Sequence, residues 1–133
     1  LVSLPNQSQK KVSDTPLILM DFSPTLIKLA GGDLDKELPS SPIAVVFGSK
    51  DIMQNRNMIW MRREGHKYGG RGYYAISDGR YKLFQNEPFL PYKLFDLFED
   101  PHETTPINFA TKELSLYKEL TKHIQTSGAI PWQ

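Results

Sequence analysis

The stretch from Gly72 to Glu103 constrains the fold more than any other part of the chain, because it contains the pattern of a β-hairpin. At its centre is Asp78-Gly79, a pair that suits the two positive-φ positions of a type I′ turn. β-prone residues flank this pair, in Tyr73 to Ser77 and in Arg80 to Asn86. The sequence therefore predicts two antiparallel strands joined by a two-residue turn.

The same turn predicts which side chains share a face of the hairpin. A two-residue turn at Asp78-Gly79 places Ile76 opposite Tyr81. It also places Tyr74 opposite Leu83, and these four side chains then share one face. The other face would carry Tyr73, Ala75, Lys82 and Phe84. The first face is the better candidate for the core.

Two more strands and a helix are predicted around the hairpin. Met58 to Arg63 and Tyr92 to Leu97 have strand composition, and Asp-Pro follows the second of these runs. The clearest helix is Thr111 to Thr126, with Thr111 as its cap and Gly128 after its end. Its apolar stripe would consist of Leu116, Tyr117, Leu120 and Ile124. The sequence therefore predicts an α+β fold, with an antiparallel sheet of about four strands packed on a C-terminal helix.

A second short structured region is predicted nearer the start of the chain. Leu17 to Met20 is an apolar, strand-like run. Asp21 or Ser23 can then cap a helix that has Pro24 in its first turn and that ends at Gly31-Gly32. Residues 1–15 are polar and lack periodicity, which predicts a loop.

The composition excludes several functions. The 133 residues include no cysteine, which excludes disulfides, thiolate metal sites and a cysteine nucleophile. The formal net charge of +1 gives no general attraction to nucleic acid or to an anionic membrane, so neither partner is predicted. No apolar run approaches the roughly 20 residues that span a bilayer.

No metal site is predicted from the histidines or the acidic residues. His66, His102 and His123 lie on three different elements and lack the close spacing of transition-metal ligands. The acidic residues between Asp96 and Glu103 could suggest calcium, but their spacing is not that of an EF-hand and Pro101 interrupts them. An acidic turn in which carboxylates cap backbone N–H groups is the better interpretation.

One loop has the composition of an anion-binding site. It lies between the first strand and the hairpin, and its candidate substrate-binding residues are Arg62, Arg63, His66, Lys67, Tyr68 and Arg71. Guanidinium groups and exposed backbone N–H groups suit sulfate or carboxylate oxygens, and Tyr68 could stack on a sugar ring. The alternative is a solvated loop whose arginines pair with acids such as Glu64.

Several motifs in this order resemble the C-terminal region of a bacterial sulfatase of the arylsulfatase type, in the alkaline-phosphatase-like superfamily. PLILMDFSPTLIKLAGG is similar to the strand and helix that close the family's N-terminal α/β domain. YYAISDGRYKLFQN and YKLFDLFEDPHET are similar to its C-terminal hairpin and acidic turn, and HIQTSGAIPWQ resembles its tail. The resemblance implies that residues 1–32 end the α/β domain, 33–57 are a connector and 58–133 form the C-terminal subdomain.

The resemblance also implies what the chain lacks. Sulfatases hydrolyse sulfate esters with a formylglycine made from the Cys or Ser of a Cys/Ser-x-Pro/Ala-x-Arg motif, beside a calcium ion. The near match SLPNQ at residues 3–7 has Gln7 in place of the arginine. No catalytic residue, metal ligand or cofactor is therefore expected in this chain, and calcium is expected in the complete enzyme.

The expected function is that of a C-terminal part that supports a sulfatase and contributes to the rim of its substrate pocket. Its partner would be the N-terminal α/β domain in the remainder of the sulfatase chain, and the substrate a sulfated carbohydrate or aryl sulfate. Localisation in the periplasm or outside the cell would follow most bacterial sulfatases. The alternative function is an independent binding module for anionic glycans.

Overall fold

The computed structural model describes residues 15–34, 56–63, 72–87 and 89–128. The chain divides into two compact units, Leu1–Asn55 and Arg56–Gln133, which are described separately. Within the described residues, neither helix has the length and apolar character needed to cross a membrane. Most of the predicted connector at residues 33–57 lies outside the described residues.

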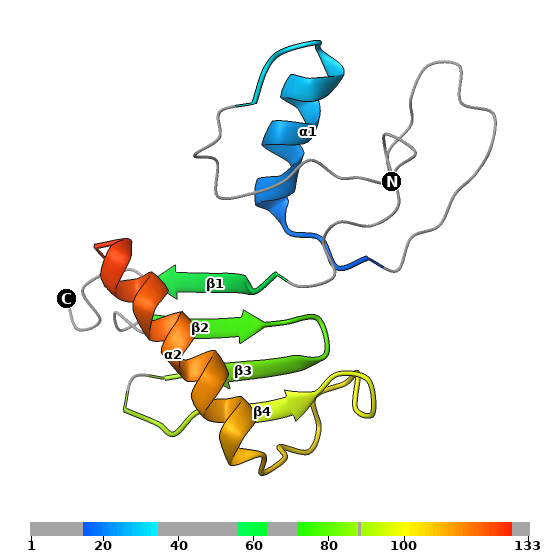
Figure 1. Ribbon diagram of the computed structural model, residues 1–133. Helices are drawn as coiled ribbons and strands as arrows, with labels where there is room; N and C mark the ends of the chain where they lie inside the picture. Colours follow the sequence, from blue (N-terminus) through cyan, green and yellow to red (C-terminus); the bar gives the residue numbers. More distant parts are fainter. Residues whose placement is uncertain (1–14, 35–55, 64–71, 88, 129–133) are drawn as a thin grey trace. The chain divides into compact units, whose positions relative to one another are not determined.

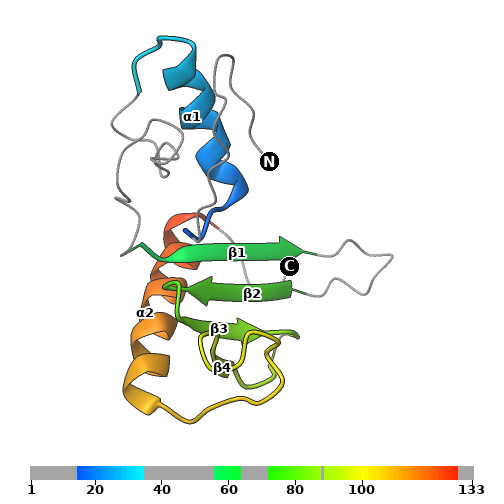
Figure 2. The same ribbon diagram turned by 90° about the vertical axis from the view of Figure 1, so that its right-hand side faces the viewer.

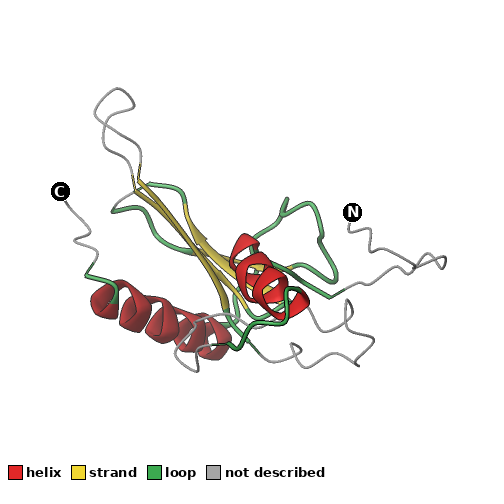
Figure 3. Ribbon diagram, turned by 90° about the horizontal axis from the view of Figure 1, so that it is seen from above, coloured by secondary structure: helices red, strands yellow, loops and turns green. Residues whose placement is uncertain are grey.

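The second unit consists of an antiparallel sheet and one long helix (Figure 1). The sheet has four strands in the order β1-β2-β3-β4 (Figure 2): β1 (Met58–Arg63), β2 (Gly72–Ser77), β3 (Tyr81–Gln85) and β4 (Lys93–Asp96). The helix α2 (Ala110–Thr126) lies along one side of the strands, as the view from above shows (Figure 3). The predicted α+β fold is confirmed.

The core lies between the sheet and α2. Leu116, Leu120 and Ile124 recur every four residues along the helix, so they share the face that packs on the strands. Their partners in the sheet are Tyr74, Ile76, Leu83 and Leu94. Leu120 is completely buried, which confirms its predicted place. Tyr117 was predicted in the same stripe but is exposed.

The β2–β3 hairpin has the predicted faces but not the predicted register. Ile76 lies opposite Leu83, and Tyr74 lies opposite Gln85. The sequence predicted Tyr81 as the partner of Ile76, so the pairing is displaced by two residues. A displacement of two keeps every side chain on its face, because side chains alternate with a period of two. The predicted core face is therefore confirmed although the register was wrong.

The turn between the two strands explains the displacement. The Asp78 N–H donates a hydrogen bond to the Tyr81 carbonyl (3.2 Å), so the turn is centred on Gly79-Arg80. Only Gly79 in this turn has a positive φ, 100°, which is the requirement of a type II′ turn. The Asp78 carboxylate accepts hydrogen bonds from the N–H groups of Arg80 (3.0 Å) and Tyr81 (2.7 Å). Asp78 is therefore the residue before the two central turn positions, and its side chain caps the turn.

The helix α2 begins one residue before its predicted cap. Its N-cap is Phe109, with no side-chain hydrogen bond, and Thr111 lies within the first turn. Lys112, in the same turn, forms an ion pair with Asp78 of the hairpin, so a tertiary contact holds this end of the helix. At the other end, Gly128 has φ +68°, as expected for a glycine that follows a helix.

In the first unit, a single turn of 3-10 helix precedes a short α-helix. The turn η1 (Leu19–Asp21) occupies part of the predicted strand, which was therefore wrong. The reason is local, since the buried Asp21 carboxylate accepts a hydrogen bond from the Ile18 N–H (3.0 Å) and bends the chain. The helix α1 (Phe22–Leu29) then starts at the predicted cap, Asp21, although that side chain does not cap it.

The end of α1 is the one predicted. Gly31 has φ +79° and donates to the Lys28 carbonyl (3.1 Å). Gly32 donates to the Ile27 carbonyl (2.9 Å), and these two bonds form a Schellman motif. The motif satisfies carbonyl groups that the helix itself leaves without partners.

Candidate anion-binding site

The strands β1 and β2 hold the two ends of the predicted anion-binding loop. Arg63 is the last residue of β1 and lies opposite Gly72, the first residue of β2. Arg62 lies opposite Tyr73 and is exposed. His66, Lys67, Tyr68 and Arg71 belong to residues 64–71, outside the described part of the chain. The structure therefore fixes the base of the loop, and the convergence of its side chains stays a prediction.

Gly72 and Tyr74, which were not among the predicted site residues, lie beside this base. A methyl group added at Gly72 would lie 3.2 Å from the Tyr74 hydroxyl, tighter than most side-chain contacts. Gly72 therefore leaves space for the buried Tyr74 ring. The Tyr74 hydroxyl is itself buried and has no hydrogen-bond partner among the residues that the structure describes. The only sequence signal for this arrangement is the spacing Gly-x-Tyr at the start of a strand.

A group of tyrosines packs on the helix side of this end of the sheet. Tyr92 meets Tyr117 of α2 edge-on, with ring centroids 5.3 Å apart. Burial, together with the neighbouring Tyr117 and Tyr74, raises the pKa of Tyr92 to about 12. Tyr92 therefore stays neutral at physiological pH and adds no charge to this end of the sheet.

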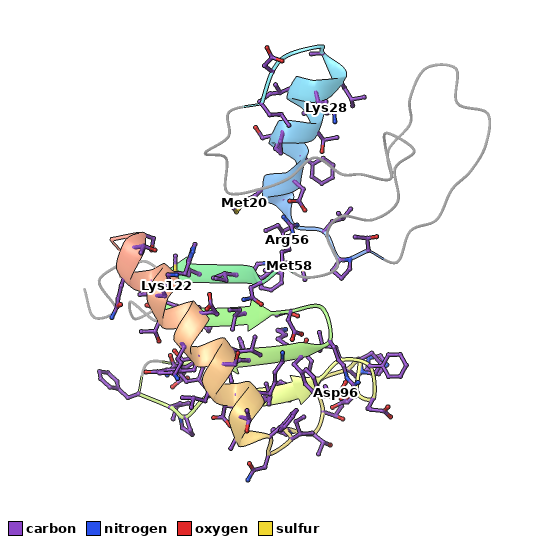
Figure 4. All side chains as sticks on the ribbon, in the orientation of Figure 1. Met20, Lys28, Arg56, Met58, Asp96 and Lys122 are labelled. Carbon is purple, nitrogen blue, oxygen red and sulfur yellow. The ribbon has the colours of Figure 1, made fainter. Side chains whose placement is uncertain are left out.

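The acidic residues after β4 are used for structure. Asp96 is labelled in Figure 4 at the end of β4. The Arg80 guanidinium forms an ion pair with it. Arg80 Nε lies 3.2 and 3.1 Å from the two carboxylate oxygens, and Arg80 Nη2 lies 2.8 Å from Oδ2. Hydrogen bonding to Arg80 holds the pKa of Asp96 below its usual value. Asp96 thus fixes the hairpin turn to the end of β4.

The turn that follows is closed by two further carboxylates. The Asp100 carboxylate accepts hydrogen bonds from the N–H groups of Thr104 (2.7 Å) and Thr105 (2.8 Å). The hydrogen bond from Thr105 is the largest cause that lowers the pKa of Asp100. Glu103, at φ 54°, binds Lys82 Nζ at 2.6 Å. The predicted acidic turn, in which a carboxylate caps backbone N–H groups, is confirmed.

These contacts bear on the question of a metal. The described carboxylates of Asp96, Asp100 and Glu103 are each occupied by a cation or by backbone donors. Among the residues that the structure describes, no group of three or more acidic or histidine side chains is arranged to hold a metal ion. The described residues therefore do not fit a calcium site.

Comparison with known proteins identifies the family. The family model for "N-sulphoglucosamine sulphohydrolase, C-terminal" matches residues 1–129. No curated protein matches the sequence significantly. Solved structures with the same fold include a protein of Bacteroides thetaiotaomicron assigned to the sulfatases, with a TM-score of 0.63 and 21% identity over 80% of this chain.

Two further solved structures are similar. A 2-O GAG sulfatase has a TM-score of 0.61 and 22% identity over 81% of this chain. A protein solved in complex with its substrate, D-glucosamine-2-N,6-O-disulfate, has a TM-score of 0.56 and 19% identity over 80% of this chain. The matched region covers 24%, 24% and 23% of these three proteins, so the chain spans about a quarter of their length.

The order of the elements agrees with this assignment. The antiparallel sheet, the acidic turn and the final helix occur in the sequence of motifs that first indicated a sulfatase. Because the family model covers nearly the whole chain, this protein belongs to the N-sulphoglucosamine sulphohydrolase C-terminal family and represents the C-terminal region of a sulfatase.

Proposed function

We propose that this chain supports the hydrolysis of sulfate esters as the non-catalytic C-terminal part of a sulfatase. The observation that carries the proposal is the family match over residues 1–129, combined with a span of only 24% of a solved sulfatase. The chemistry then belongs to the larger part of such an enzyme. The chain contributes structural support and one side of the substrate pocket.

The sequence supports a non-catalytic role. A sulfatase nucleophile comes from Cys or Ser within a motif that ends in arginine, and the chain has no cysteine. Its near match at residues 3–7 has Gln7, which cannot supply the charge-assisted hydrogen bonds of a guanidinium to a sulfate. These five residues lie outside the described part of the chain. The calcium ion expected for catalysis would also lie in the larger part.

The surface of the first unit supports the proposal that the partner of this chain is a second domain. Its helix α1 buries the polar Thr25 and the N-cap Asp21, while Leu19 is 84% exposed and Leu26 is 62% exposed. This is the reverse of the usual pattern, in which the apolar face of a helix is buried. Further exposed apolar residues of this segment are Leu17, Met20, Phe22, Ile27 and Leu29. We assign this surface to contact with the α/β domain of the sulfatase.

The substrate-facing element in the proposal is the loop between β1 and β2. Arg62 and Arg63 end β1, and four more candidate residues follow in the loop. A similar protein has D-glucosamine-2-N,6-O-disulfate as its substrate. Arginine and lysine side chains suit such a ligand because each sulfate group offers several acceptor oxygens. The proposed substrate class is therefore a sulfated carbohydrate.

The experiment is a titration of the chain with D-glucosamine-2-N,6-O-disulfate at low salt, followed by the amide shifts in an NMR spectrum. Low salt is needed because exposed charges are screened over roughly 8 Å at physiological ionic strength. We expect shifts in residues 62–72, and weaker binding in Lys67→Ala and Arg71→Ala. Lys118→Ala, an exposed charge on α2, is the matched control. Shifts confined to other regions would contradict the assignment of this loop.

The competing function, an independent glycan-binding module, has one observation in its favour. The sheet and α2 of the second unit form a separate hydrophobic core, whose buried residues lie between Tyr74 and Ile124 in the sequence. A test of the exposed apolar surface of α1 can distinguish between the two proposed functions. A docking surface should bind a hydrophobic dye, and Leu26→Lys should reduce that binding. If the chain binds no dye, yet binds the sulfated sugar as tightly as a complete site would, the independent module is favoured.

A further inference from the structure

The face of the sheet away from α2 carries aromatic and basic side chains at its loop end. Ile59 packs against the core under α2, so its neighbours along β1 lie on the opposite face. The same alternation applies to the residues between the buried positions of the other strands. The residues on this part of the sheet, named here the aromatic–basic face, are Trp60, Arg62, Tyr73, Phe84 and Lys93.

The strand register aligns these residues in two neighbouring rows across the sheet. Trp60 lies opposite Ala75, and Ala75 lies opposite Phe84. A small side chain therefore separates two aromatic ones that stand two strand spacings apart, about 10 Å. Lys93 lies opposite Phe84 on the next strand, and Arg62 lies toward the β1–β2 loop.

Exposure is confined to one part of this face. Arg62 and Lys93 are exposed, and the Trp60 side chain is 44% exposed. At the other end of the face, Phe95 is buried, and Lys82 beside it is bound to Glu103 of the acidic turn. Accessible aromatic surface is thus kept beside the end of the sheet where β1 and β2 enter their loop.

The charged strand residues on this side of the sheet are all basic. Among the described residues they are Arg62, Lys82 and Lys93, and Lys82 is bound to Glu103 of the acidic turn. A partly exposed indole beside Arg62, with Lys93 across the sheet on β4, suits a ligand that combines an apolar ring face with anionic groups. A sulfated sugar has both features, whereas an apolar protein segment would bury the exposed Lys93 ammonium against an apolar surface.

We propose that the aromatic–basic face is a platform for a sulfated sugar ring. The C–H face of the ring packs on the Trp60 indole, and sulfate oxygens accept hydrogen bonds from Arg62 and Lys93. The inference extends the proposed function, because the platform adjoins the base of the proposed anion-binding loop and would hold a ring next to the one in the loop. It needs no residue of the loop itself.

The test uses the tryptophan itself as the reporter. Trp60 and Trp132 are the two tryptophans of the chain, so Trp132→Phe leaves Trp60 as the only one. In that background, D-glucosamine-2-N,6-O-disulfate should cause a saturable change in Trp60 fluorescence. Sodium sulfate and unsulfated N-acetylglucosamine at equal concentration should cause little change. An equal change with sodium sulfate would overturn the stacking contact, since it would show an ion near the indole without a ring.

Affinities from NMR titrations of single variants complete the test. Trp60→Ala should raise Kd about tenfold, equal to about 1.4 kcal/mol, and Trp60→Phe should recover most of this loss because it keeps an aromatic face. Arg62→Ala should also raise Kd, while Lys118→Ala on α2 should leave it unchanged. A Kd for Trp60→Ala within about twofold of the parent value would overturn the platform.

The loop variants make the two proposals separable. If Lys67→Ala and Arg71→Ala abolish binding while Trp60→Ala has no effect, the loop is the site and the platform is wrong. If Trp60→Ala weakens binding and the loop variants do not, the platform stands and the loop assignment fails. Self-association of the chain that Trp60→Ala prevents, without any effect on sugar binding, would assign this face to a second copy and overturn the platform.

Discussion

Replacement of Leu120 by alanine tests the packing of α2 on the sheet. The Leu120 side chain is 0% exposed and lies between Leu116 and Ile124 on the helix face that contacts the strands. Alanine has three fewer carbon atoms, which at about 0.8 kcal/mol for each buried group removes about 2.4 kcal/mol of transfer free energy. The cavity that remains adds to this cost, so the expected loss is about 3 to 5 kcal/mol.

The assay is urea unfolding of the chain, followed by far-UV circular dichroism. The free energy of unfolding should fall by the stated amount, and the slope against urea should stay unchanged if only stability is altered. The matched control is Leu114→Ala, on the same helix but 52% exposed, which should cost no more than about 0.5 kcal/mol. Equal effects of the two variants would refute the docking of α2 on the sheet.

Three further predictions concern the hairpin, the acidic turn and the buried tyrosine. Gly79→Ala should destabilise the chain by about 1 kcal/mol or more in urea unfolding, because alanine is strained at the positive φ of the turn; an unchanged midpoint would contradict the observed turn. The lowered pKa of Asp96 contributes stability above its unfolded pKa of about 3.9, and this contribution is lost as the pH falls through the folded pKa. Asp96→Asn should therefore flatten the acid limb of the stability profile, and a limb of unchanged slope would contradict this role. The pKa of Tyr92 is raised to about 12, so the contribution of its neutral form to folding stability is complete below pH 10 and is lost as the pH rises toward 12. Tyr92→Phe should remove the highest-pH step of tyrosinate absorbance.

Much of the second unit could be predicted because local and periodic signals agree there. The bounds of β1 were predicted to the residue, and the helix stripe placed Leu116, Leu120 and Ile124 correctly. The hairpin register was wrong for a reason of turn chemistry. Asp-Gly suits a type I′ turn, but the Asp78 side chain instead caps the turn that follows it, and only Gly79 needs a positive φ.

Other errors arose where a side chain or a tertiary contact overrides local propensity. The run Leu17 to Met20 looked like a strand, but the Asp21 carboxylate binds the Ile18 N–H and makes a helical turn. Composition contains no signal for that bond. Thr111 is a good capping residue, yet the helix starts before it, at Ala110, and Lys112 in its first turn pairs with Asp78 of the hairpin. This pairing depends on the hairpin, because Asp78 lies 34 positions before Lys112 in the sequence.

The candidate site could be predicted only in part. The sequence singles out Arg62 and its basic neighbours as an anion-binding candidate because of residue type alone, and this assignment stays a prediction. It gave no indication that Trp60 shares a face with Arg62, Phe84 and Lys93, since that depends on pairing between separate strands. The role of Gly72 was also invisible, because it follows from the position of the Tyr74 hydroxyl.

The central claim is that this chain belongs to a sulfatase but does not carry its chemistry. The most direct measurement is the rate of aryl sulfate hydrolysis by the purified 133-residue chain, with and without added calcium, compared with its Ser3→Ala variant. We predict no turnover above the uncatalysed rate for either protein under both conditions. Turnover that persists through purification and disappears in Ser3→Ala would contradict the claim, because it would place the nucleophile in this chain.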